Sequence, residues 1–163
     1  MKPERVFVGL GSNLGDPQGQ LAQALRSMGQ LPQTRLLACS VFYRSAPLQA
    51  SGPDYLNAVA ELSTEFEPLP LLAALQAIEA AQGRQRSTLN APRTLDLDLL
   101  LYGQRQMGLP ALTLPHPRLH ERAFVLRPLL ELAPDLVHPS RGPLQALLGA
   151  TREQRLERLL PKS

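Results

Sequence analysis

Two carboxylates, Asp96 and Asp98, lie two residues apart in the run APRTLDLDLLLY (residues 91–102). Leucine alternates with polar residues here, and a period of two predicts a strand. Alternate residues of a strand point to the same face about 7 Å apart, so both carboxylates should converge on one surface. Such a pair suits Mg²⁺, which takes one or two carboxylates plus substrate phosphates; a solvated strand edge is the alternative. The expected apolar face comprises Leu95, Leu97, Leu99 and Leu101.

Three arginines, Arg84, Arg86 and Arg93, directly precede this strand in a segment without any acidic residue. Arginines that bind phosphate oxygens beside carboxylates that bind metal are what an ATP–metal site requires. The alternative is that the arginines pair with Asp96, Asp98 or Glu79. Surface ion pairs contribute little to stability, so the functional interpretation is favoured.

The segment LPHPRLHERAF (residues 114–124) adds two histidines and two arginines. Zinc binding by His116 and His120 is disfavoured, because Pro117 biases His116 away from helix and no His-Glu-x-x-His pattern is present. Contacts of His116 and Arg122 with an anion fit better, and structural roles for both residues stay open.

Other nucleotide and hydrolase signatures are missing from the chain. No Walker lysine motif occurs, GLGSNLG lacks the Gly-x-Gly-x-x-Gly spacing, and Gly-x-Ser-x-Gly is absent. A flat heterocycle could instead stack on Tyr55 and Phe124, with Asn57 reading its polar edge. Core packing and a turn are the alternatives for these residues.

The composition is that of a globular protein: 163 residues, 44% hydrophobic and 19% charged, with a net charge of +3. No apolar run approaches the roughly 20 residues that cross a bilayer, and no signal peptide is recognised, so we expect the cytoplasm. The single cysteine, Cys39, is expected to be a buried small hydrophobe. We expect one domain, residues 1–163.

The predicted elements alternate in a regular order. Residues 5–11, 36–45 and 55–64 read as strands, like the aspartate run; helices are expected from Asp16-Pro17 to Gly29 and from Pro68 to Gly83. This strand-helix-strand-strand-helix-strand order predicts an α+β fold: a four-stranded antiparallel sheet with both helices on one face. Proline-broken short helices follow from residue 109.

Together, four segments resemble the 6-hydroxymethyl-7,8-dihydropterin pyrophosphokinases of folate biosynthesis. They are GSNLGD (11–16), YLNAV (55–59), APRTLDLDLLLY (91–102) and LPHPRLHERAFVLRPLLELAP (114–134). The resemblance implies a ferredoxin-like βαββαβ core with a C-terminal helical extension. It also implies transfer of a diphosphate from ATP to the pterin hydroxymethyl group, with release of AMP.

The resemblance assigns roles by residue. Two Mg²⁺ ions would bind to Asp96 and Asp98, which with Arg84 and Arg93 form the expected catalytic set. The residues expected to bind ATP are Gln76, Glu79, Arg84, Arg86, Arg93, His116 and Arg122. The residues expected to bind the pterin are Ser45, Ala46, Leu48, Tyr55, Asn57 and Phe124.

One departure concerns residues 88–90, which read Thr-Leu-Asn where many members carry an arginine or an arginine–tryptophan pair. Lower activity, or a catalytically silent homologue, would follow from that loss. A second alternative is an RNA-binding module, which would need aromatic residues and a basic face on the sheet. We expect a monomer that binds the two small substrates, with no nucleic acid or membrane partner.

Overall fold

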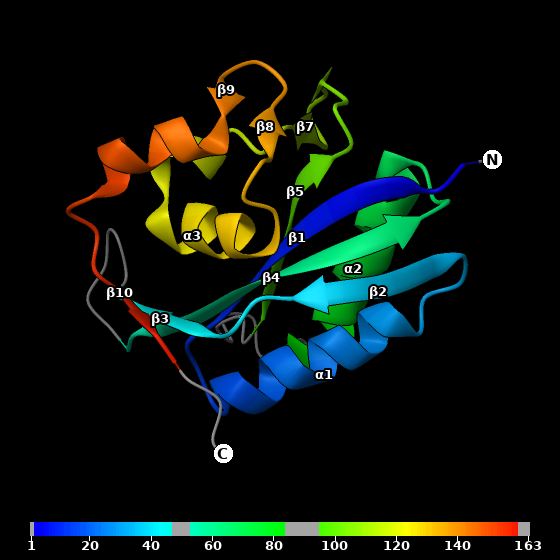
Figure 1. Ribbon diagram of the computed structural model, residues 1–163. Coiled ribbons are helices and arrows are strands. Elements are labelled where there is room, and N and C mark those ends of the chain that lie inside the picture. Colours follow the sequence, from blue (N-terminus) through cyan, green and yellow to red (C-terminus); the bar gives the residue numbers. More distant parts are fainter. Residues whose placement is uncertain (1, 47–52, 84–94, 160–163) are drawn as a thin grey trace.

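The computed structural model describes residues 2–46, 53–83 and 95–159 (Figure 1). Its first part contains β1 (Glu4–Ser12), α1 (Pro17–Gly29), β2 (Thr34–Cys39), β3 (Tyr43–Ser45), β4 (Tyr55–Thr64), α2 (Pro68–Gly83) and β5 (Asp96–Tyr102). Its second part contains β6 (Met107–Gly108), β7 (Thr113–Leu114), η1 (Leu119–Glu121), α3 (Ala123–Leu132), β8 (Val137–His138), β9 (Gly142–Pro143), η2 (Leu144–Thr151) and β10 (Leu156–Arg158).

The main sheet is antiparallel and its strands alternate with helices along the chain, as the sequence predicts. However, the sheet has six strands rather than four. The strand order is β10-β3-β4-β1-β5, and β2 also pairs with β4. The predicted strand 36–45 is divided because residues 40–42 leave the ladder. At this point the Ser40 N–H still donates to the Val59 carbonyl of β4 at 2.9 Å. The Val59 N–H, however, donates to the side-chain oxygen of Ser40, Oγ, at 3.0 Å. The sixth strand, β10, comes from the C-terminal segment, where only helical pieces and a tail are predicted.

Helix α1 begins and ends where the sequence predicts. The Asp16 side chain accepts a hydrogen bond from the Gly19 N–H at 3.2 Å, and Pro17 occupies the first turn. An N-cap of this kind satisfies one of the free N–H groups of the first turn. Helix α2 likewise spans Pro68–Gly83, so the local signals at both helices are confirmed.

Helices α1 and α2 cover one face of the sheet, where they enclose the larger hydrophobic core (Figure 1). Strand β1 contributes Val6, Val8 and Leu10 to this core. The fully buried helix residues in it are Leu21, Ala24, Met28, Leu71 and Leu75.

The prediction that the two helices between the strands pack on one face is confirmed, but the pattern does not predict that the other face is covered as well. Helix α3 packs on the second face, and η2 packs against α3, so that both contribute to another core around Phe7 and Val59. Leu101 belongs to this second core, although the simple alternation places it with Leu97 and Leu99. The reason is an irregularity in the β1–β5 pairing, where Phe7 faces Leu101 and Val8 faces Leu99, so that Leu100 is an extra residue. Such a bulge reverses the faces of the residues beyond it.

Two further expectations are tested by the fold. Within the described ranges no helix is long and apolar enough to cross a bilayer. Cys39 is half-buried against the larger core, and burial together with the charge of Glu131 raises the pKa of its thiol to about 11. The thiol is therefore neutral and unreactive near pH 7.

Two leucines of α2 offer a matched test of this packing. Leu71 is fully buried, whereas Leu69 on the same helix is 43% exposed. We expect Leu71→Ala to lower the free energy of unfolding by about 2–5 kcal/mol, because it removes buried methyl groups and leaves a cavity. Leu69→Ala should change it by less than about 0.5 kcal/mol. Denaturant titration of both variants checks this, and equal losses would contradict the assignment of the core.

Candidate active site

The candidate site is built on two cross-strand rows at one end of the second sheet face. In the first row, Asn57 of β4 pairs with Gly11 of β1, and Gly11 pairs with Asp96 of β5. In the next row, Gly9 pairs with Asp98. Cross-strand partners direct their side chains to the same face, so both aspartates flank positions that carry no side chain. The two glycines thus leave an open floor between Asn57 and the carboxylates.

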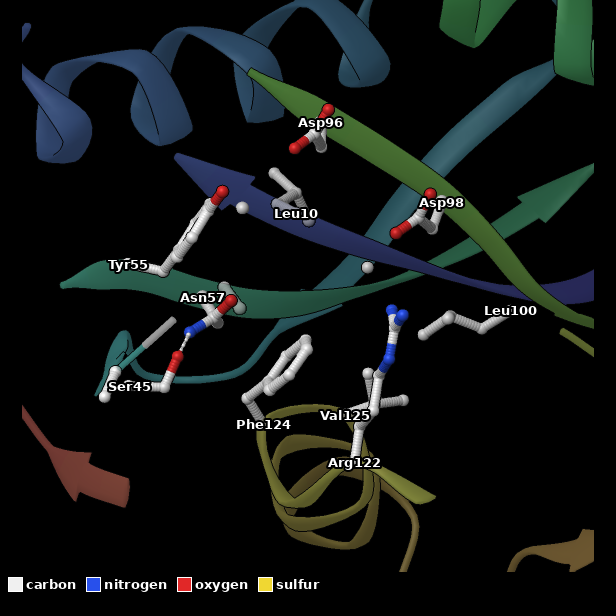
Figure 2. Close-up of a pocket in the computed structure, with 14 residues that line it drawn as sticks. Leu10, Ser45, Tyr55, Asn57, Asp96, Asp98, Leu100, Arg122, Phe124 and Val125 are labelled. Carbon is white, nitrogen blue, oxygen red and sulfur yellow. Dashed lines mark hydrogen bonds between the residues drawn. The ribbon is translucent and has the colours of Figure 1, made fainter. Parts of the chain in front are cut away.

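A cavity of about 220 Å³, here named the sheet cavity, lies over this floor (Figure 2). Figure 2 shows Asp96 and Asp98 projecting from β5 on one side of it, and Arg122 and Phe124 rising from the start of α3 on the other. The full lining is Gly9, Leu10, Gly11, Ser45, Ala46, Tyr55, Asn57, Ala58, Asp96, Asp98, Leu100, Arg122, Phe124 and Val125.

The Asn57 amide is fixed in orientation. It is only 4% exposed, and its Nδ2 donates a hydrogen bond to Ser45 Oγ at 2.6 Å. Its Oδ1 lies on the other side, toward Gly11: a Cβ on Gly11 would come within 3.4 Å of it. A buried amide with one side bonded and the other facing a cavity is suited to recognise a polar heterocycle edge.

Two aromatic rings, Tyr55 of β4 and Phe124 of α3, line the same cavity from different elements (Figure 2). The Arg122 guanidinium lies 5.5 Å from the centre of the Phe124 ring, which is within range of a cation–π interaction. The cavity therefore combines stacking surfaces with a cation near the carboxylates.

A second cavity of about 290 Å³, the α2 cavity, lies beside β5, the edge strand of the sheet. Its lining includes Gln76, Glu79 and His116 from segments distant in sequence, together with Asp98. Glu79 is held in place because its Oε2 accepts a hydrogen bond from the Leu97 N–H at 2.7 Å. Asp98 lines both cavities, so the two hollows meet at this exposed carboxylate.

His116 is held in its neutral form near pH 7. Burial lowers the pKa of its imidazole below the ordinary value of 6.5, the nearby Asp98 carboxylate opposes this shift, and the positive charges of Arg122 and Arg118 reinforce it. Its Nδ1 accepts a hydrogen bond from the Arg118 N–H at 3.1 Å, so the proton of the neutral ring belongs on Nε2.

The structure thus gathers most of the predicted residues around Asp98, in two groups. Arg122 lines the sheet cavity rather than the α2 cavity, although the resemblance groups it with the ATP-binding residues. Four predicted residues, Leu48, Arg84, Arg86 and Arg93, lie outside the described residues.

The floor glycines, Gly9 and Gly11, and the apolar lining residues Leu100 and Val125 were not predicted from the sequence. The two glycines could have been recognised from the strand pattern. In VFVGLG, Phe7, Gly9 and Gly11 alternate with Val6, Val8 and Leu10, and a glycine inside a strand often marks a close approach by a ligand. Leu100 had no such signal, because it lines the cavity only through the bulge.

Neutralising the two charged residues that act on His116, Asp98 and Arg122, should move the pKa of its imidazole in opposite directions. Asp98→Asn removes a negative charge that favours the imidazolium, so the pKa of His116 should fall further. Arg122→Met removes a positive charge that disfavours it, so the pKa should rise toward 6.5. NMR titration of the imidazole in the metal-free protein measures both shifts. Shifts in the same direction would show that these charges do not govern His116.

Comparison with known proteins gives one consistent family. The model of the family described as "7,8-dihydro-6-hydroxymethylpterin-pyrophosphokinase (HPPK)" matches residues 7–134, more than half of the chain. A 2-amino-4-hydroxy-6-hydroxymethyldihydropteridine pyrophosphokinase from Pseudomonas aeruginosa is 50% identical over 96% of this chain and 97% of its own length. The protein of the same name from Haemophilus influenzae is 45% identical over 96% of this chain and 98% of its own length.

Solved structures share the fold at low sequence identity. A crystal structure of an HPPK-DHPS in complex with substrates aligns with a TM-score of 0.74 at 10% identity, covering 92% of this chain and 43% of that chain. An HPPK-DHPS triple mutant from Plasmodium falciparum aligns with a TM-score of 0.72 at 12% identity, covering 91% and 44%. The chain spans less than half the length of these two proteins. On the family match and the two relatives, the chain belongs to the 7,8-dihydro-6-hydroxymethylpterin-pyrophosphokinase family.

Proposed function

We propose that this chain transfers the diphosphate group of ATP to the hydroxymethyl group of 6-hydroxymethyl-7,8-dihydropterin, releasing AMP, as a step of folate biosynthesis. The observation that carries the proposal is the meeting of two cavities of different chemistry at Asp98. A reaction between two bound substrates requires two adjacent sites that bring the reacting atoms together. Family membership supports the same assignment.

The sheet cavity would hold the pterin. Its ring would stack on Tyr55 and Phe124, and its polar edge would meet the oriented Asn57 amide. The glycine floor supports this placement, because a side chain at Gly11 would enter the space between Asn57 and Asp96, and one at Gly9 would press against Leu100 in the cavity lining.

The α2 cavity would hold the nucleotide, with its phosphates directed toward Asp98. Gln76 and Glu79 would line the nucleotide side, and neutral His116 could donate a hydrogen bond to a phosphate oxygen. Arg122 lines the sheet cavity together with Asp98, and its charge would stabilise the phosphoryl oxygens during transfer.

The donor set at Asp96 and Asp98 fits Mg²⁺. Hard oxygen ligands from neighbouring same-face positions suit this ion, and the described residues contain no group of three or more His, Cys, Asp or Glu that could hold a metal unaided. Oxygens of the substrate phosphates would therefore complete the coordination. Bound Mg²⁺ would neutralise the charge that develops on the phosphates.

The remaining chemistry is positioning. Phosphoryl-type transfer needs in-line placement and charge stabilisation rather than a covalent intermediate with the protein. The side chains at the junction supply a hydrogen-bond donor, a cation and two carboxylates, held on β5, on the start of α3 and on the segment before η1.

The RNA-binding alternative loses support from the fold. It requires an open sheet face with stacking aromatics, whereas α3 packs on the second face and α1 and α2 cover the first. The silent-homologue alternative rests on residues 88–90, which lie outside the described residues, and it is left to experiment.

Four finer assignments accompany the proposal. The strand order supports a ferredoxin-like core, if β2 and β3 are counted as one interrupted strand beside β4, β1 and β5. A single domain that acts as a monomer in the cytoplasm completes the proposal.

The first test is AMP release from Mg²⁺-ATP with and without 6-hydroxymethyl-7,8-dihydropterin. We expect pterin-dependent AMP, with diphosphorylated pterin formed in equal amount, because the diphosphate moves as a unit. High-performance liquid chromatography quantifies both products. A folded protein that binds ATP but releases no AMP would favour the silent homologue and contradict the proposal.

Removing one carboxylate should abolish turnover without unfolding the protein. Asp98 is exposed, so Asp98→Ala should leave the melting temperature unchanged, while kcat falls at least about 100-fold with the loss of charge stabilisation at the junction. Asp135→Ala, at an exposed aspartate beyond α3, is the matched control and should keep full activity. Near-normal turnover of Asp98→Ala would remove Asp98 from the mechanism.

A further inference from the structure

The C-terminal residues 151–159 contact both walls of the sheet cavity, although they lie beyond the segment 7–134 that the family model matches. One wall is β3 with the adjoining Ala46, and the other is the start of α3. The two walls belong to segments that are distant in sequence. Because the C-terminal segment contacts both of them, it can determine the distance between the walls, and so the width of the cavity.

The first contact is a strand pairing. Strand β10 pairs antiparallel with β3, with Leu156 opposite Ser45 and Glu157 opposite Arg44. The Leu159 N–H continues the ladder by donating to the Phe42 carbonyl at 2.8 Å. Strand β3 has only three residues, so this second partner stabilises the backbone that carries Ser45, the acceptor of the Asn57 amide.

The second contact is made by the Gln154 side chain at the start of α3. The Ala123 N–H donates to Gln154 Oε1 at 2.9 Å, and Gln154 Nε2 donates to the Glu121 carbonyl at 2.7 Å. Arg122, the N-cap residue of α3, is extended and makes no side-chain capping bond. Gln154 therefore supplies a cap from elsewhere in the chain and brackets Arg122 on both sides.

Gln154 is itself held in position. Its N–H donates to the Thr151 carbonyl at 3.0 Å, and the buried Thr151 hydroxyl donates to the Leu148 carbonyl at 2.9 Å. The side chain is thus presented by a fixed turn at the end of η2 rather than by a free tail.

A further cavity beside Phe124 connects the Gln154 cap to the position of this ring. An outer cavity of about 240 Å³ is lined by Ser45, Ala46, Ala123, Phe124, Glu153, Gln154 and Arg155. Phe124 lines this outer cavity as well as the sheet cavity, although it also packs against the second core. A ring with cavities beside it is held by fewer neighbours than a core ring, so its position depends more on the backbone that carries it.

We propose that Gln154 is a positioning residue for the sheet cavity: by capping α3 it places Phe124 and Arg122 opposite the strands, and with β10 it sets the width of the pterin site. The inference rests on the proposed function for its ligand. Its structural part, the ordering of the start of α3 by Gln154, stands independently of the ligand.

The test compares Gln154→Ala with Gln145→Ala, which removes an exposed glutamine of η2 on a different surface. Isothermal titration with the pterin and, separately, with Mg²⁺-ATP gives the two affinities. For Gln154→Ala we expect the Kd for the pterin to rise roughly five- to tenfold, the loss typical of a helix cap. The Kd for ATP should rise by a smaller factor than the Kd for the pterin, because Gln76, Glu79 and His116 lie on other elements and only Arg122 of the expected ATP-binding residues is bracketed by Gln154. Gln145→Ala should match the wild type in both.

A conservative variant and a ligand-free readout complete the design. Gln154→Glu keeps the acceptor for the Ala123 N–H but loses the donor to the Glu121 carbonyl, so its pterin affinity should lie between those of the wild type and Gln154→Ala. In hydrogen–deuterium exchange without substrates, a peptide covering residues 119–126 should exchange faster in Gln154→Ala than in the wild type. In Gln145→Ala the exchange rate of this peptide should equal that of the wild type.

The outcomes separate this inference from the proposed function. Unchanged exchange and unchanged pterin affinity in Gln154→Ala would overturn the inference, as would equal losses for pterin and ATP, which indicate a general structural role. A wild-type protein that binds ATP but no pterin would overturn the proposed function and the pterin part of the inference. Even in that case, the exchange measurement would still decide whether Gln154 orders α3.

Discussion

Strand β1 imposes the constraint on which the rest of the structure depends, because it is hydrogen-bonded to β4 on one side and to β5 on the other. Its period of two sends Val6, Val8 and Leu10 into the larger core, where they are essentially fully buried. The register is thereby fixed, since a slip of one residue would move all three out of the larger core to the other face of the sheet. The same register leaves Gly9 and Gly11 on the opposite face, with Gly11 between Asp96 and Asn57 and Gly9 between Asp98 and Val59.

The second face of the sheet is divided between stability and function. At one end Phe7 and Leu101 pack beneath α3 in a closed core, and at the other end the glycine floor opens into the sheet cavity. The bulge at Leu100 lies at this boundary, where it turns an extra leucine toward the cavity. The helix that seals the core thus also brings Arg122 and Phe124 to the site at its first turn.

Charge at the junction is arranged for an anionic substrate. Asp98 lines both cavities, Arg122 lines the sheet cavity, and His116, kept neutral by burial and by the neighbouring arginines, lines the α2 cavity. A neutral imidazole adds a hydrogen-bond donor without pairing with the carboxylate as a full cation would. Under the proposed function, Asp98 is therefore available to the metal ion that would accompany the phosphates.

The sequence by itself determined the local structure and the chemistry of the site. Asp16-Pro17 and the prolines at 68 and 70 begin the helices, and alternation placed Asp96 and Asp98 on one strand face, because caps and strand periods depend on neighbouring residues. Only the tertiary structure decided the bulge at Leu100, the covering of the second face by α3, and the capping of α3 by Gln154. Each of these depends on contacts between segments far apart in the chain, for which a linear pattern carries no signal.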